Sequence, residues 1–392
     1  MLQDHSRQAI PSNLPPAHLP LAHLRQAVLT CAMPDMILIL NAGSSSVKMA
    51  LFEVGAAVAR GKAECGDDGW RLVVHGADGG VLDDRSGDDP AAMALDWALD
   101  HAGEDALSAV GHRIVHGGPD FCAPVRVTGD VLDRLQALTP LAPLHQPPGL
   151  APIRAIMARR PDLPQAACFD TAFHHTMPPV ATRLPLPRAY ADRGVRRYGF
   201  HGLSYEHIAA RLPDVAPGLI AGRVVVAHLG NGASLCAMQA GRSVDTTMGF
   251  TALDGLMMGT RCGARDPGVL LYMMQHDGLS PQEVEQVLYH RSGLLGVSGL
   301  SSDMRALSGS GDPRAQEAVA LFVHRVAQEA AAMAASMGGI DGFVFTGGIG
   351  EHDAAVRATI CDRLRWMGGI AVHVIPTDEE AVIARHTQAV LR

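Results

Sequence analysis

The strongest constraint on the fold is a strand–turn–strand unit that occurs twice in the chain. Residues 36–52 (MILILNAGSSSVKMALF) contain an apolar run, a turn rich in Asn, Gly and Ser, and a second apolar run. Residues 223–238 (RVVVAHLGNGASLCAM) follow the same plan. Short apolar runs joined by small polar residues are typical of β-hairpins. The sequence therefore predicts two matching hairpins with polar turns, although the first one alone is equally typical of an ordinary hairpin.

A third glycine-rich segment completes this pattern. Residues 342–345 form a short apolar run, and residues 346–352 (TGGIGEH) supply a glycine-rich loop that leads into a predicted helix at residues 351–367. The backbone N–H groups of such loops can bind phosphate oxygens. Together the three units predict a duplicated α/β architecture, in which the two polar turns hold phosphates and the third loop holds a nucleoside.

Composition narrows the class of protein. The 392 residues suffice for two domains, and the net charge of −8 argues against nucleic acid or an anionic membrane as a partner. No apolar run approaches the ~18 residues that a membrane-spanning helix needs. The seven cysteines are scattered without a CxxC pair, which indicates reduced thiols in a cytoplasmic protein. Residues 1–35 are interpreted as a disordered extension, or as sequence ahead of the true start.

Charged and imidazole side chains beside glycines or at strand ends are the candidates for catalysis. Arg113 lies in GHRIVHGG, which is equally typical of a surface strand, and Arg261 lies in the loop GTRCG. Asp170 follows a predicted strand, a position where the ligand sites of α/β proteins gather. His145 stands among prolines, and His201 precedes a predicted helix.

Helix ends give two further expectations. Ser204 is predicted to cap the helix that follows His201. Asp303 is equally typical of a helix N-cap and of a ligand-binding residue. Helices are also predicted at residues 90–102 and 315–337, and two glycines end the second of them.

Nine segments in a fixed order resemble the acetokinase family. They are NAGSSSVK, GHRIVHGG, CFDTAFHHTMP, RRYGFHGLS, HLGNGAS, GTRCG, SGLSSDMR, FTGGIGE and PTDEE, and they extend from residue 36 nearly to the C-terminus. The resemblance implies an α/β fold of two ribonuclease-H-like domains, the duplicated actin-like ATPase fold of acetate and sugar kinases. One domain would comprise residues 36–170 and 381–392. The nucleotide-binding domain would comprise residues 171–380.

The resemblance also implies an activity. The γ-phosphoryl group of ATP would pass directly to acetate in the presence of Mg²⁺ or Mn²⁺, giving acetyl phosphate and ADP in a reversible reaction. The alternative is a kinase for propionate or another short-chain fatty acid. The resemblance further implies a cytoplasmic homodimer. A regulatory or chaperone-type module on this fold would lack the convergent Arg113, Arg261 and His201 and would carry a separate partner-binding domain. A non-catalytic structural protein of actin type would show extended assembly surfaces.

By resemblance, each catalytic candidate has a role. Arg113 and Arg261 hold the carboxylate and the moving phosphoryl group, for which a planar guanidinium is well suited. His201 stabilises the transition state, and His145 lies near the same centre. Asp170 orients either an arginine or the carboxylate. Replacing either arginine with alanine is expected to lower turnover and to leave the melting temperature nearly unchanged.

The remaining assignments by resemblance concern binding. The acyl-binding residues are Arg113, Val115, Leu144, Phe200 and Ala252. The metal residues are Asn41 and Glu379, whose oxygen atoms suit Mg²⁺. The nucleotide-binding residues are Ser44, Ser46, Lys48, His228, Leu229, Gly230, Asn231, Gly232, Asp303, Met304, Arg305, Gly348, Ile349, Gly350, Glu351 and His352.

Three positions depart from the pattern of the family. Ala252 stands where proline is usual, in the wall of the acyl pocket. Arg265 replaces an aliphatic residue, and His352 replaces an asparagine. The first departure bears on acyl-chain preference and the third on the choice of nucleotide. None of them removes a catalytic group.

Overall fold

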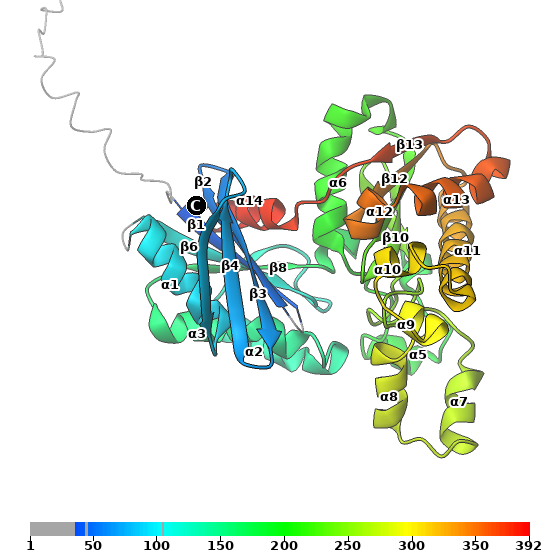
Figure 1. Ribbon diagram of the computed structural model, residues 1–392, viewed down its shortest axis with the longest axis horizontal. Coiled ribbons are helices and arrows are strands. Elements are labelled where there is room, and N and C mark those ends of the chain that lie inside the picture. The colour runs from blue at the N-terminus through cyan, green and yellow to red at the C-terminus, as the bar shows by residue number, and fades with distance from the viewer. Residues whose placement is uncertain (1–35, 44–45, 104–105) are drawn as a thin grey trace, which may run out of the picture. The chain divides into compact units, whose positions relative to one another are not determined.

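The computed structural model describes residues 36–43, 46–103 and 106–392, and it contains two sheets (Figure 1). The expected extension at residues 1–35 lies outside the described residues. The first sheet has the strand order β5-β4-β3-β2-β1-β6-β8-β7. Its strands are β1 (Met36–Ala42), β2 (Ser46–Glu53), β3 (Ala56–Gly66), β4 (Gly69–Gly76), β5 (Val81–Gly87), β6 (Leu107–Ile114), β7 (Val125–Arg126) and β8 (Gln165–Phe169).

The second sheet repeats the centre of the first. Its order is β11-β10-β9-β12-β13. In both sheets the strand after the polar turn pairs antiparallel with the strand before it, as β2 does with β1 and a later strand does with its predecessor in the second sheet. The strand before the turn also pairs in parallel with a strand much further along the chain. The strands are β9 (Arg223–Leu229), β10 (Ala233–Gln239), β11 (Arg242–Thr246), β12 (Gly342–Thr346) and β13 (Ala371–Val374). The two predicted hairpins and the duplicated architecture are therefore confirmed.

The described chain contains fourteen α-helices, several of which cover the faces of the two sheets, whereas α7 and α8 project away from them (Figure 1). The helices are α1 (Pro90–Ala102), α2 (Gly129–Ala137), α3 (Gln146–Arg159), α4 (Pro179–Thr182), α5 (Arg188–Asp192), α6 (Gly202–Val215), α7 (Gly268–Gln275), α8 (Pro281–His290), α9 (Gly293–Ser298), α10 (Met304–Ser308), α11 (Pro313–Ser336), α12 (Gly347–His352), α13 (Ala354–Leu364) and α14 (Glu379–Leu391). None of the helices in the described part of the chain is long and apolar enough to span a bilayer.

The side chains of the central strands point alternately to the two faces of the sheet, and each face packs against different helices. In β1, Leu38 and Leu40 contact the cluster that contains α1 and α3, whereas Ile37 and Ile39 contact α14. Since successive side chains of a strand point to opposite faces, a continuous apolar run is buried on both sides. Strand β9 repeats this arrangement, with α6 on one face and α11 on the other.

One close approach requires a glycine. A Cβ atom at Gly111 in β6 would lie 2.3 Å from Oγ1 of Thr387 in α14. The C-terminal helix therefore packs directly on the backbone of the first sheet. This contact places Glu379, the first residue of α14, near the end of β1 that carries Asn41.

Three local expectations need correction. The segment TGGIGEH does not form an open loop, because residues 347–352 form the short helix α12. Its first residue, Gly347, turns the chain with a φ of +77°. The next helix consequently begins at Ala354, capped by the Asp353 side chain. Ser204 does not cap α6, since His201 occupies the N-cap position and the Ser204 hydroxyl contacts His228 instead. Asp303 does cap α10, accepting a bond from the Arg305 N–H group.

Candidate active site

The centre of the candidate site is an arginine held by a buried carboxylate. Arg113 lies near the carboxyl end of β6, and Asp170 follows the neighbouring parallel strand β8. Nε of Arg113 donates to Oδ1 of Asp170 at 3.0 Å, and Nη2 donates to Oδ2. This bidentate geometry fixes the plane of the guanidinium. Of the two roles expected for Asp170, the geometry fits the orientation of an arginine.

The surrounding carboxylates keep Arg113 charged. Burial by itself would lower the pKa of this guanidinium, but Asp170 and Glu379 reverse that effect and raise the pKa above its usual value. The Asp170 side chain is only 1% exposed, so water screens the pair weakly. Arg113 is thus a fixed positive charge at the end of the first sheet.

Asn41 links this arginine to two glutamates at the start of α14. Its Oδ1 lies 3.4 Å from Nη1 of Arg113, and its Nδ2 donates to Glu379 at 3.1 Å and to Glu380 at 3.0 Å. No cluster of three or more His, Cys, Asp or Glu side chains that could hold a metal is found within residues 36–43, 46–103 and 106–392. Mg²⁺ is usually held by one or two carboxylates together with phosphates and water, and Asn41 with Glu379 supplies such a partial set.

His201 adopts an unusual backbone conformation that aims its ring toward the second sheet. Its φ is +58° and ψ is 23°, in the left-handed region, and the next residue, Gly202, donates its N–H to the Asp170 carbonyl. Nδ1 of His201 lies 2.9 Å from Oγ of Ser234, and its ring stacks on His228 at 4.3 Å between centroids. Burial, followed by the charges of His228 and Arg113, lowers the pKa of His201 well below its usual value. The imidazole is therefore neutral at pH 7.

Arg261 meets His201 beside a glycine of the second hairpin turn. A Cβ atom at Gly232 would lie 2.9 Å from Nη2 of Arg261 and 3.2 Å from Nε2 of His201. The other end of the guanidinium, Nη1, donates to the carbonyl of Ala252 at 2.7 Å. Only glycine at position 232 leaves the arginine and the imidazole free to share this space.

His145 lies within the field of both arginines. Burial is the largest influence on its pKa, and together with Arg261 and Arg113 it lowers this pKa to about 4. His145 is also 6.5 Å from Tyr289 between ring centroids. The structure therefore places a neutral imidazole near the two fixed cations.

The expected acyl-binding residues only partly cluster. Val115 and Phe200 are buried in one apolar cluster, and Ala252 packs against that cluster. Leu144 is half-buried and lies outside it. The apolar wall beside Arg261 is thus built mainly by Val115, Phe200 and Ala252.

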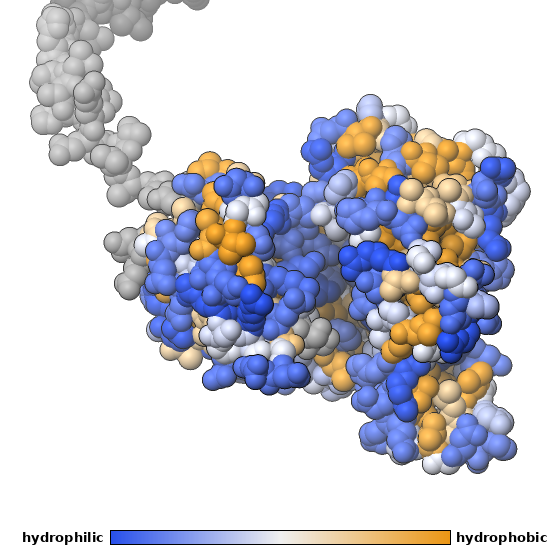
Figure 2. Space-filling model, viewed as in Figure 1, coloured by the Kyte–Doolittle hydropathy of each residue, from blue (hydrophilic) through white to orange (hydrophobic). Residues whose placement is uncertain are grey.

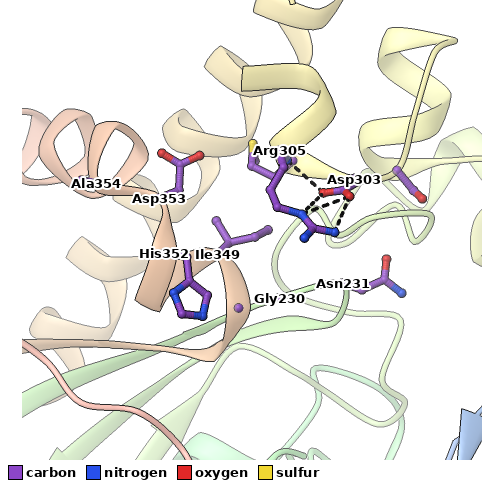
Figure 3. A pocket seen from close by; sticks show the side chains of 11 residues that line it. Gly230, Asn231, Asp303, Arg305, Ile349, His352, Asp353 and Ala354 are labelled. Atoms are coloured by element: carbon purple, nitrogen blue, oxygen red, sulfur yellow. Dashed lines mark hydrogen bonds and ion pairs between the residues drawn. The ribbon is translucent and has the colours of Figure 1, made fainter. Parts of the chain in front are cut away.

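Two cavities contain most of the expected nucleotide-binding residues. A polar cavity of about 410 Å³ is lined by Lys48, His201, His228, Gly230, Asn231, Gly232, Gly347, Gly348, Glu351, Thr377, Glu379 and Glu380. A second cavity of about 570 Å³ is lined by Gly230, Asn231, Ser302, Asp303, Met304, Arg305, Gly348, Ile349, His352, Asp353 and Ala354 (Figure 3). The two cavities share Gly230, Asn231 and Gly348, so they lie next to each other.

Three of the assigned nucleotide-binding residues that the structure describes do not line these cavities. Leu229 is fully buried in the core, and Gly350 is a buried residue of α12 that packs against β9 and β12. Ser46 begins β2, where its carbonyl accepts a bond from Gly43. Ser44 falls outside the described residues.

Several lining residues had no sequence-based assignment. They are Ser302, Gly347, Asp353, Ala354, Thr377 and Glu380. Most of them adjoin an assigned residue, and a wider window around each motif would have included them. Glu380 directly follows the assigned Glu379, and its contact with Asn41 is visible only in the structure.

Buried histidines make the stability of this protein sensitive to acid. Burial lowers the pKa of His112, His116, His145 and His174 to about 4. An unfolded histidine titrates near pH 6.5, so between about pH 6.5 and 4 the unfolded chain binds more protons than the folded one. Stability should therefore be fully present above about pH 6.5 and be lost progressively as the pH falls toward 4.

His112 provides the test, because successive side chains of a strand point to opposite faces and His112 therefore points away from the face of Arg113. Its Nε2 is hydrogen-bonded to Gln165 at 2.7 Å. We expect the melting temperature of His112→Gln to depend less steeply on pH than that of the unmodified protein between pH 6.5 and 4. Calorimetry across this range measures both slopes. Equal slopes would show that His112 does not contribute.

Comparisons with known proteins agree with this geometry. The model of the Acetokinase family matches residues 36–381. An acetate kinase of Rhodopseudomonas palustris is 50% identical over 389 residues, covering 90% of this chain and 98% of the relative. The structure of Porphyromonas gingivalis acetate kinase matches with a TM-score of 0.82, 36% identity and coverage of 91% and 100%. A propionate kinase from Francisella tularensis matches with a TM-score of 0.85, 35% identity and coverage of 91% and 99%. These solved structures confirm the predicted fold class.

Proposed function

Because the chain belongs to the acetokinase family, we propose that it transfers the γ-phosphoryl group of ATP to acetate, giving acetyl phosphate and ADP (EC 2.7.2.1). The observation that carries this proposal is the convergence of Arg261 and His201 on Gly232, beside the polar cavity of about 410 Å³. Phosphoryl transfer needs positioned cations and donors around the moving group and little covalent chemistry from the protein. This arrangement supplies them.

The carboxylate substrate needs no general base. Acetate is already ionised at pH 7, so the acceptor oxygen only has to be oriented toward the γ-phosphorus. We assign this orientation to Arg113, whose guanidinium plane is fixed by Asp170. We assign the moving phosphoryl group to Arg261, which the Ala252 carbonyl anchors at its other end. His145 would remain a neutral polar neighbour of both.

A hydrogen-bond chain gives His201 a defined role. The Tyr205 hydroxyl lies 2.5 Å from Oγ of Ser234, which in turn lies 2.9 Å from Nδ1 of His201. If Tyr205 donates to Ser234 and Ser234 donates to Nδ1, the ring proton of the neutral imidazole lies on Nε2. Burial raises the pKa of Tyr205, which keeps its proton in place. His201 would then donate from Nε2 to a phosphoryl oxygen as negative charge develops.

We propose that the two adjoining cavities bind different parts of the nucleotide. We place the phosphates in the polar cavity with Lys48 and His228, and the nucleoside in the larger cavity that Asp303, Ile349 and His352 line (Figure 3). Asn41 and Glu379 would hold Mg²⁺ or Mn²⁺. When bound, this ion neutralises phosphate charge. We also propose that the chain forms two domains, one of residues 36–170 with 381–392 and the other of residues 171–380. Each domain would then contain one of the two sheets.

Assembly and location follow from the same family. We propose a homodimer, and the apolar helix α7 is the surface that supports it. Each residue of α7 is at least partly exposed, with Val269 at 43%, Leu271 at 52% and Tyr272 at 55% exposed. Figure 2 shows hydrophobic residues at the surface near α7 and α8. A cytoplasmic location agrees with the cysteines, because all six within the described residues are free thiols.

A direct assay tests the proposed activity. Hydroxylamine traps acetyl phosphate as a hydroxamate, so incubation with MgATP and acetate should give hydroxamate and ADP in equal amounts. A regulatory or structural protein on this fold would give neither product. ADP formation without hydroxamate would indicate hydrolysis of ATP and would overturn the proposal.

Acyl-chain preference is the subject of a separate prediction. Ala252 has roughly two methylene groups fewer than the proline that is usual at this position in the family. Each methylene group is worth about 0.8 kcal/mol when buried. A longer acyl chain regains part of that contact, so propionate should be used with a kcat/KM comparable to that of acetate. A hydrophobic pocket discriminates one methylene by only roughly 10- to 200-fold, and acetate should still react.

Ala252→Pro should move the ratio of kcat/KM values back toward acetate by several-fold. Ala252→Val is the matched variant, since it fills the wall without constraining the backbone whose carbonyl holds Arg261. The measurement is kcat/KM for acetate, propionate and butyrate at saturating MgATP. An unchanged ratio in both variants would mean that Val115 and Phe200 determine the preference.

A further inference from the structure

A third cavity, of about 340 Å³, lies behind the loop that carries Arg261 and is lined by three arginines. Arg265 precedes α7, Arg291 follows α8, and Arg325 lies in α11. No Asp or Glu is among the residues that line it. None of the three arginines forms an ion pair within 4.0 Å of a carboxylate in residues 36–43, 46–103 and 106–392. The lining therefore carries three positive charges and no negative charge. Glu283, which interacts with Arg291, and Glu329, which interacts with Arg325, lie outside it.

One donor in this cavity is buried and unused. Nε of Arg265 has no hydrogen-bond partner among the described residues, although Nη1 of the same side chain donates to the Gly263 carbonyl at 3.0 Å. A buried N–H group without an acceptor is costly, and such a group in a native structure calls for an explanation. Arg265 is also the position where this sequence carries a cation in place of an aliphatic residue.

Apolar walls strengthen the attraction that this cavity offers to an anion. Met257, Val297 and Leu321 complete the lining beside the arginines. In surroundings of low dielectric constant, the interaction between opposite charges is stronger than in water. Planar guanidinium groups from three separate elements suit an oxyanion with more than one charged oxygen.

We propose that this cavity is a second binding site, separate from the substrate site, for a small oxyanion that carries two or more negative charges. A phosphate dianion and a short dicarboxylate share this chemistry and fit the available volume. The bound anion would accept the free N–H of Arg265 and balance the charges of Arg291 and Arg325.

The reactivity of Cys262, which lines the cavity, can report whether an anion is bound there. Arg265 opposes the rise in the pKa of this thiol that burial produces. An anion bound to Arg265 would cover the thiol. It would also offset the positive charge of Arg265, so the pKa of Cys262 would rise further and its alkylation should slow. Cys65, exposed on β3 in the other sheet, serves as the internal control.

The experiment measures alkylation of each cysteine by iodoacetamide with mass spectrometry, at constant ionic strength, with inorganic phosphate in one series and malonate in another. Mass action predicts that the rate at Cys262 falls about tenfold at an anion concentration about ten times the apparent Kd, while the rate at Cys65 is unchanged. Protection by phosphate alone identifies a phosphoryl ligand, and protection by malonate alone identifies a dicarboxylate.

Variants decide where the anion binds. Arg265→Leu should abolish the protection, and Arg126→Leu, an exposed arginine of β7, should retain it. If Arg265→Leu does not fold, Arg325→Leu tests the same cavity from α11. Absence of protection by both anions would overturn the proposal, as would equal protection in Arg265→Leu. Protection that is lost in Arg113→Ala and kept in Arg265→Leu would place the anion in the substrate site and also overturn it.

Discussion

Arg261→Ala should lower kcat for acetyl phosphate formation by about two orders of magnitude or more, because a preorganised cation that faces developing charge is worth several kcal/mol. The melting temperature should change little. Arg261 makes its hydrogen bond to the backbone carbonyl of Ala252, so its removal leaves no carboxylate without a partner. Steady-state kinetics and thermal unfolding of the same preparation measure both effects.

Two matched variants sharpen this test. Arg261→Lys keeps the charge and loses the planar fork, so it should recover only part of the activity. Arg126→Ala removes an exposed arginine of the other sheet and should leave kcat unchanged. A kcat for Arg261→Ala within a fewfold of the unmodified value would show that Arg261 does not face the transferring group.

Arg113→Ala should lower kcat by a similar factor and should also destabilise the fold. The structure changes the sequence-based expectation here, because Asp170 would be left buried and without its partner. Removing one member of a buried ion pair typically costs about 3–5 kcal/mol. The free energy of unfolding should therefore fall for Arg113→Ala and stay nearly constant for Arg261→Ala.

The double variant Arg113→Ala/Asp170→Asn separates the two consequences. A neutral amide at position 170 removes the unpaired charge, so stability should recover in part while activity stays low. Recovery of activity together with stability would contradict the assignment of Arg113 to the substrate. Equal stability of the single and double variants would contradict the role of the ion pair.

Elements with a strong local signal were predictable from the sequence. Both hairpins, the helix at residues 90–102 and the strand before Asp170 appear as expected, because apolar runs and turn residues determine them locally. The duplication was also visible, since the same strand–turn–strand pattern occurs in both halves. The structure extends it to a shared order of five strands in the two sheets.

Contacts between distant segments were not predictable in the same way. The sequence brings no signal that Asn41 contacts Glu380, 339 positions away, or that Arg113 rather than the substrate is the partner of Asp170. The N-cap at His201 was missed for a related reason, since its left-handed conformation is imposed by the packing of Gly202 on the Asp170 backbone. Such features depend on tertiary packing, which single-residue preferences do not record.

Attack of a carboxylate oxygen on the γ-phosphorus is the central claim, and oxygen-18 tests it most directly. With acetate labelled in both oxygens, attack on the γ-phosphorus places one labelled oxygen in the bridge of acetyl phosphate. Hydroxylamine then cleaves the bond to the acyl carbon, and the released phosphate retains the label. We predict one labelled oxygen in each phosphate released, and unlabelled nucleotide. Label in AMP, or its absence from the phosphate, would contradict attack of the carboxylate on the γ-phosphorus.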